Sequence, residues 1–230
     1  MKPRVHLFAA AALLTASAVS QAATMTLSGW TYGNGNHVNA SAPAYKGEGG
    51  GFSGTLNGVT GFGPAIDAYC VELGQTISFG STYSNYSLVS ASSYFGSAKA
   101  STLGKLLTYA NPLVSGAATG SQDDASTSLQ LAIWNTVYDS DSTLTSYAGA
   151  IFSDASTFAA QANTFLSGAL GTLSTLDVFV LKSDTNQDQL IWRPSRDQGN
   201  DVPEPASLAL ALSAIGALGW SSRRRRPAAR

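Results

Sequence analysis

The single cysteine and one glutamine have the residue types and positions best suited to chemistry in this 230-residue chain. Cys70 lies in the apolar segment AIDAYCVEL, and Gln130 lies in LQLAIW, four residues before Trp134. This spacing places Gln130 and Trp134 on one helix face, where a buried amide must find a partner or incur a desolvation penalty. Together they predict a thioester: the Cys70 sulfur attacks the side-chain carbon of Gln130, and ammonia leaves.

A thioester would make the domain an electrophile that an amine on a partner, such as a lysine, could open covalently. The aromatic residues around both segments would shield the bond from hydrolysis. The alternative is purely structural. A cysteine on a strand commonly acts as a small hydrophobic residue, Gln130 would then hydrogen-bond to backbone, and LQLAIW would simply be an amphipathic helix. The sequence leaves both interpretations open.

These residues also resemble a known family. Tyr69-Cys70 and the QLAIW segment that begins at Gln130 are similar to motifs of the thioester (TQxA-type) domains of bacterial surface adhesins. The resemblance covers about residues 60–140 and implies a covalent adhesin in which Cys70 and Gln130 crosslink. Leu129 stands where that family often has threonine.

Other kinds of active site have little support in the sequence. His37 is the one histidine between the two terminal segments, so neither a His-based metal site nor a catalytic triad is predicted, and a His37–Cys70 protease pair is a weak alternative. Asp139 and Asp141 resemble part of a calcium loop, but its other ligands and central glycine are absent. We therefore expect no enzymatic activity, no cofactor and no metal.

The elements that must position Cys70 and Gln130 follow from the hydrophobic pattern. Residues 24–90 contain short alternating or apolar runs separated by Gly, Asn and Pro, which predict strands. The segments LDVFVLK and QLIWR flank a polar turn near the end of the domain and predict a C-terminal β-hairpin. The order of strands, then helices, then hairpin predicts an α+β fold.

Two to three helices are expected between about residues 100 and 170. The first, STLGKLLTYA, should end at Asn111-Pro112. Ser121 is the predicted N-cap of the second, which carries Gln130. The third should span roughly residues 145–168, where apolar residues recur at helical spacing.

The C-terminus has the composition of a sorting signal. Val202-Pro203-Glu204-Pro205 precedes an apolar run that ends at Trp220, and a basic cluster follows, formed by Arg223, Arg224, Arg225 and Arg226. Basic flanks hold the end of a membrane segment in the cytoplasm, and the prolines keep the preceding peptide extended. These three parts resemble the PEP-CTERM sorting signal of Gram-negative bacteria. The resemblance implies removal of the tail by an exosortase, in cells that form exopolysaccharide or biofilm.

The N-terminus has the composition of a secretory signal peptide. Lys2 and Arg4 precede an apolar run, and small residues follow, so cleavage is expected after Ala22 or Ala23. The predicted organisation is a signal peptide, an exported globular domain, a linker with the PEP motif, a transmembrane sorting helix and a cytoplasmic tail, over residues 1–23, 24–198, 199–205, 206–222 and 223–230. Signal peptidase and exosortase are the expected processing partners.

Charge and cysteine content limit the classes of partner and the crosslinks that the domain can have. Residues 24–201 contain six Lys and Arg against thirteen Asp and Glu, a net charge of −7, which argues against binding to nucleic acid. A single cysteine excludes a disulfide within the chain. The prediction is a non-enzymatic protein, exported, transiently anchored in the inner membrane and then placed at the cell surface or outside the cell. The expected partner there is exopolysaccharide or another surface protein.

Overall fold

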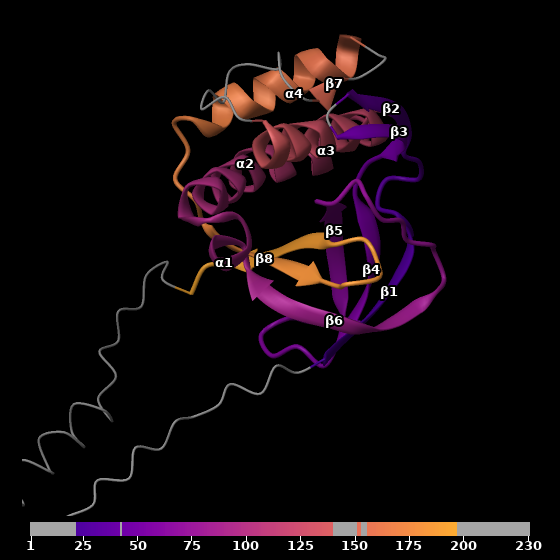
Figure 1. The fold of residues 1–230 in the computed structure, drawn as a ribbon. Coiled ribbons are helices and arrows are strands. Elements are labelled where there is room, and N and C mark those ends of the chain that lie inside the picture. The colour runs from indigo at the N-terminus through magenta and orange to yellow at the C-terminus, as the bar shows by residue number, and fades with distance from the viewer. Residues whose placement is uncertain (1–21, 42, 140–150, 153–155, 197–230) are drawn as a thin grey trace, which may run out of the picture. The chain divides into compact units, whose positions relative to one another are not determined.

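The computed structural model describes residues 22–41, 43–139, 151–152 and 156–196 (Figure 1). The PEP motif, the sorting helix and the arginine cluster lie outside these residues, as does nearly all of the signal peptide. Among the described residues, no helix combines the length and the apolar character needed to cross a membrane.

The main sheet is a closed six-stranded barrel. Its strand order is β1 (Ala22–Trp30), β4 (Phe52–Asn57), β5 (Ala65–Cys70), β9 (Gln189–Pro194), β8 (Leu176–Lys182) and β6 (Thr82–Ser90), which pairs with β1 to close the ring. Alternate residues of β1 point inward, because Ala23, Met25 and Leu27 are fully buried. Closure leaves the sheet without free edges along the paired strands.

A second, smaller sheet supports one side of the helical layer. It contains β2 (Asn36–Ser41), β3 (Ala44–Gly49) and β7 (Ile151–Phe152), in the order β3-β2-β7. Strands β2 and β3 form an antiparallel pair, and both contact helix α3 (Gln122–Tyr138).

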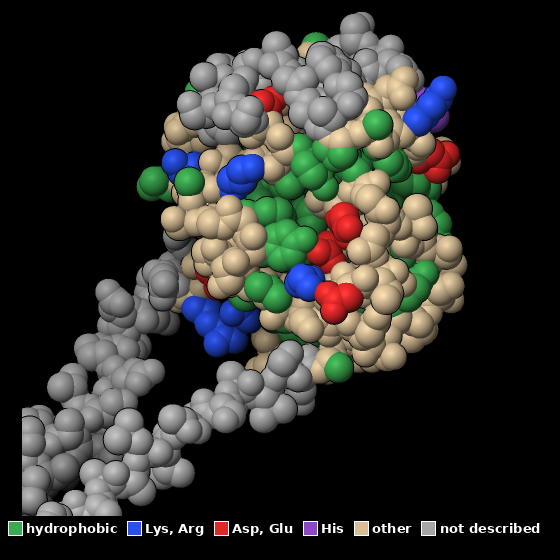
Figure 2. Space-filling model, in the orientation of Figure 1, with side chains coloured by type: hydrophobic (Ala, Val, Ile, Leu, Met, Phe, Trp, Pro, Cys, Tyr) green, Lys and Arg blue, Asp and Glu red, His purple; other side chains and the backbone are tan. Residues whose placement is uncertain are grey.

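The described residues also form four helices, which are α1 (Ala91–Phe95), α2 (Ser97–Ser115), α3 and α4 (Ser156–Ala169). Helix α3 contacts α2, α4 and strand β5, and its residues Ala125–Asn135 are all buried. It is therefore the central helix of a layer that packs against the barrel (Figure 1). Figure 2 shows hydrophobic side chains gathered between the helices and the barrel on one face, with acidic side chains beside them.

The predicted α+β organisation is confirmed in outline, with a strand-rich N-terminal part, a helical middle and two C-terminal strands. Strands β8 and β9 are neighbours in the barrel, as the hairpin prediction required. The closed barrel was not predicted, because closure depends on pairing between β1 and β6, which are distant in the sequence.

Two helix predictions were wrong in their boundaries. Helix α2 continues through Pro112 to Ser115, because its last turn places Val114 in the core at 1% exposure, and this burial offsets the missing amide. The third helix does not include Ile151, which belongs to β7, and α4 begins at Ser156. Ser121 does precede α3, but its side chain makes no capping hydrogen bond.

We expect the melting temperature of the domain to be the same with and without a metal chelator or a reductant. Cys70 is buried and forms no disulfide, and the described residues contain no group of three or more potential metal ligands. Core burial then supplies the stability. Thermal unfolding followed by circular dichroism checks this, and a large drop with either reagent would reveal a metal or an intermolecular disulfide.

Candidate functional site

Cys70 ends strand β5, where the barrel meets helix α3. β5 pairs with β4 as far as Ala68 and with β9 through Cys70, which lies opposite Gln189. Only 2% of Cys70 is exposed. Its sulfur donates to the Glu72 carbonyl oxygen at 2.8 Å, so the thiol is held at the end of the strand.

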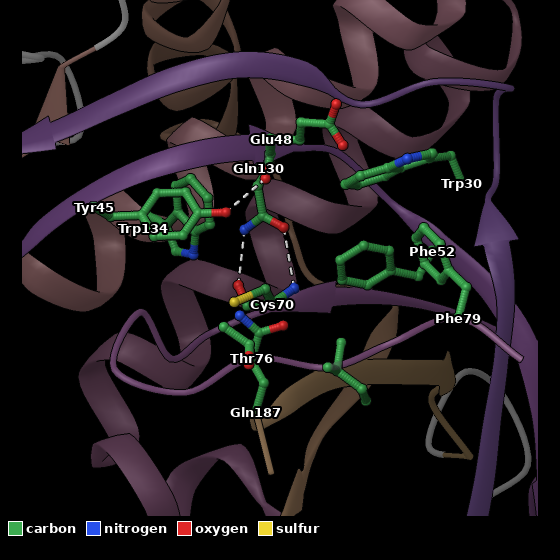
Figure 3. A pocket seen from close by; sticks show the side chains of 11 residues that line it. Trp30, Tyr45, Glu48, Phe52, Cys70, Thr76, Phe79, Gln130, Trp134 and Gln187 are labelled. Atoms are coloured by element: carbon green, nitrogen blue, oxygen red, sulfur yellow. Dashed lines mark hydrogen bonds between the residues drawn. The ribbon is translucent and has the colours of Figure 1, made fainter. Parts of the chain in front are cut away.

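Helix α3 places the Gln130 side chain directly against Cys70. Gln130 is completely buried. Its Nε2 donates to the Cys70 carbonyl at 2.8 Å, and its Oε1 accepts from the Cys70 backbone N–H at 3.0 Å. The side-chain amide thus satisfies both backbone polar groups of Cys70, as a neighbouring strand would (Figure 3).

The structure therefore brings the two candidate thioester residues together on the same side of the core. In the described geometry Cys70 carries a free thiol and the Gln130 amide pairs with backbone, which is the arrangement of the purely structural alternative. In the same arrangement Cys70 and Gln130 both line one cleft. The thioester itself stays a prediction.

The surroundings of the thiol are apolar and aromatic. Trp134, one helical turn after Gln130, is 1% exposed and packs edge-to-face on Tyr45 with ring centroids 5.3 Å apart. Burial raises the pKa of the Cys70 thiol, while the Glu72 backbone and the Trp134 indole N–H oppose the rise. The thiol is therefore protonated at neutral pH and is a poor nucleophile towards reagents in solution.

A cleft of about 210 Å³ opens onto Cys70 and Gln130. One wall is a cluster of Trp30, Phe52 and Phe79, whose ring centroids lie 4.9–5.6 Å apart. Tyr45 and Trp134 line the cleft as well (Figure 3). Phe79 is 41% exposed, so the aromatic wall is open to a ligand arriving from solvent.

Several residues that shape the site were not identified from the sequence. The Tyr138 hydroxyl donates to the Val71 carbonyl at 2.9 Å and accepts from the Leu73 amide at 3.2 Å. The Gln187 amide donates to the Glu72 and Gln75 carbonyls. Together these bonds fix the backbone that follows Cys70. Tyr138 lies two helical turns after Gln130, so helical periodicity could have indicated it, whereas nothing in the sequence around Gln187 points to its role.

The weaker sequence candidates lie elsewhere. His37 is an exposed residue of β2 and is not among the residues that line the Cys70 cleft. Asp139 follows α3 and accepts a hydrogen bond from Asn135 at 2.9 Å; Asp141 lies outside the described residues. The structure therefore does not place His37 beside Cys70 in that cleft.

Comparison with known proteins identifies the tail. Residues 201–226 match the PEP-CTERM protein-sorting motif, which confirms the sequence-based identification of the sorting signal. The motif marks an exported protein that is transiently anchored in the membrane and processed by an exosortase.

No curated protein matches the chain. Among solved structures, the N-terminal domain of the Streptococcus pyogenes pilus tip adhesin Cpa is similar at 15% identity and a TM-score of 0.46, over 77% of this chain and 96% of that one.

Proposed function

We propose that this protein is a covalent surface adhesin, in which Cys70 and Gln130 form an internal thioester that captures an amine on a partner. The observation that carries the proposal is that Cys70 and Gln130, both buried, come together from distant parts of the chain and line one aromatic cleft. Sorting by an exosortase would deliver the domain to the surface of a biofilm- or exopolysaccharide-forming cell.

Formation of the thioester requires no external reagent. The Cys70 sulfur turns from the Glu72 carbonyl and attacks the side-chain carbon of Gln130. The carbon–nitrogen bond breaks, the thiol proton passes to the departing nitrogen, and ammonia leaves. The Cys70 N–H already donates to Oε1, so it can stabilise the negative charge that develops on this oxygen.

Capture of a partner reverses the roles of the sulfur and the nitrogen. An amine nitrogen attacks the thioester carbonyl carbon, and the carbon–sulfur bond breaks. The amine proton passes to the sulfur, which leaves a secondary amide on residue 130 and a free Cys70 thiol. Each molecule reacts once, so the protein is not an enzyme. The aromatic wall suits the alkyl chain of a lysine, whose neutral amine is the form that attacks.

Amine labelling tests this function. The purified exported domain is incubated with a biotin-linked primary alkylamine, and the modified residue is located by peptide mass spectrometry. We expect a single label on residue 130 in the wild type and none in Cys70→Ala or Gln130→Ala. An unlabelled wild type, or a Cys70→Ala variant that is labelled equally, would contradict the proposal.

A second cleft favours non-covalent binding as another candidate function. It has a volume of about 410 Å³ and is lined by Tyr32, Asp67, Asn111 and Trp192, among others. Partly exposed aromatic rings next to carboxylate, amide and hydroxyl groups suit a polar ligand with apolar faces, such as exopolysaccharide. In that case the protein would be a matrix component, and Cys70 would remain a buried thiol.

A further inference from the structure

The indole N–H of Trp134 is a buried donor with no hydrogen-bond partner among the described atoms. Trp134 is 1% exposed, and a buried N–H is normally paired because leaving it unpaired is costly. An exception of this kind calls for a reason, and active sites are one place where unpaired donors are retained.

The neighbours of the indole are already engaged in other bonds. Both polar ends of the Gln130 amide bind the Cys70 backbone. The Tyr45 ring packs edge-to-face on Trp134, while its hydroxyl donates to the Glu48 carbonyl at 2.9 Å. Burial is the main cause that raises the pKa of Tyr45 to about 12, so this hydroxyl stays protonated and keeps its own acceptor.

The Cys70 sulfur is the group that the indole N–H can act on. Trp134 lies beside Cys70 and Gln130 in the cleft (Figure 3). The indole N–H lowers the pKa of the Cys70 thiol, against the larger effect of burial, although it makes no hydrogen bond of standard geometry.

We propose that Trp134 is a catalytic residue of the thioester site, and that its indole N–H stabilises the negative charge on the Cys70 sulfur as the carbon–sulfur bond breaks. The inference rests on the proposed function. A thioester sulfur is a weak acceptor and a departing thiolate is a strong one, so the interaction strengthens in the transition state and accelerates opening. The Cys70 N–H would stabilise the negative charge on the carbonyl oxygen, and the Trp134 N–H would stabilise the negative charge on the sulfur.

The Trp134→Phe variant tests this role, with Tyr109→Phe as the control. Tyr109 is a half-buried residue of α2 that lines neither cleft, and its replacement by phenylalanine also removes a hydrogen-bond donor. Opening by methylamine is followed through the appearance of free thiol, after intact mass has shown that the thioester is present. We expect opening in Trp134→Phe to be about 10 to 100 times slower than in the wild type, and Tyr109→Phe to be unchanged. A Trp134→Phe thioester that opens at the wild-type rate would overturn the proposal.

A second measurement uses the wild-type domain and does not depend on the folding of a variant. The indole N–H resonances of Trp30, Trp134 and Trp192 are compared before and after opening with methylamine. We expect the Trp134 resonance to shift more than the other two, and equal shifts would overturn the proposal. If intact mass shows no thioester, the proposed function fails; the same spectra of wild type and Cys70→Ala then still test the contact between the indole and the sulfur.

Discussion

In a Cys70→Ala background, replacing Gln130 with alanine lowers the free energy of unfolding by about 2–5 kcal/mol, because two buried backbone groups of residue 70 lose their hydrogen-bond partner. The background removes the thiol, so no thioester contributes to either protein. Urea denaturation of the single and double variants measures the difference.

The matched control is Gln122→Ala in the same background. Gln122 is the first residue of α3, and its amide makes an exposed hydrogen bond to the Ser115 carbonyl at 2.8 Å. We expect a loss below about 1 kcal/mol there, since water can replace the exposed bond. Equal losses at Gln122 and Gln130 would mean that the hydrogen bonds from the Gln130 amide to the backbone of residue 70 do not stabilise the domain.

Deleting Arg223 to Arg226, or replacing Glu204 with alanine, should leave the precursor in the membrane fraction of the native host. The two changes act on different parts of the sorting motif. Loss of the basic cluster removes the charge that holds the C-terminal flank in the cytoplasm, and loss of Glu204 alters the extended peptide that the exosortase recognises. Fractionation followed by immunoblotting measures the distribution.

Asp197→Asn is the control for charge loss, because Asp197 lies upstream of the matched motif. It should be processed and released as the wild type is. Extracellular protein that still carries the arginine cluster would contradict processing of the tail, and so would unchanged release of both motif variants.

The sequence was most informative where a residue type was rare. The single cysteine, and a glutamine on an apolar helix face, led to the prediction that Cys70 and Gln130 form one site. In the structure the Gln130 side-chain amide hydrogen-bonds to the Cys70 backbone. The sorting signal was identifiable because its three parts are adjacent in the chain. The sorting signal needed only local information, whereas Cys70 and Gln130 were paired by their residue types although they lie 60 residues apart in the sequence.

The remaining features depend on pairings between distant segments. Trp30 and Phe52 lie opposite each other across the β1–β4 strand pair, and Phe79, from the segment before β6, packs against both. Pro112 normally ends a helix, and here burial of Val114 in the following turn outweighs that preference. The pairing of a side-chain amide with the end of β5 likewise requires α3 to cross that strand, and no local pattern specifies the crossing.

The central claim is that Cys70 and Gln130 share a thioester, and the intact mass of freshly exported domain tests it most directly. The protein is kept in acid and analysed with and without a thiol-alkylating reagent under denaturing conditions. The thioester predicts a mass lower than the sequence value by one ammonia, and no alkylation. The full sequence mass, with Cys70 alkylated in every molecule, would contradict it.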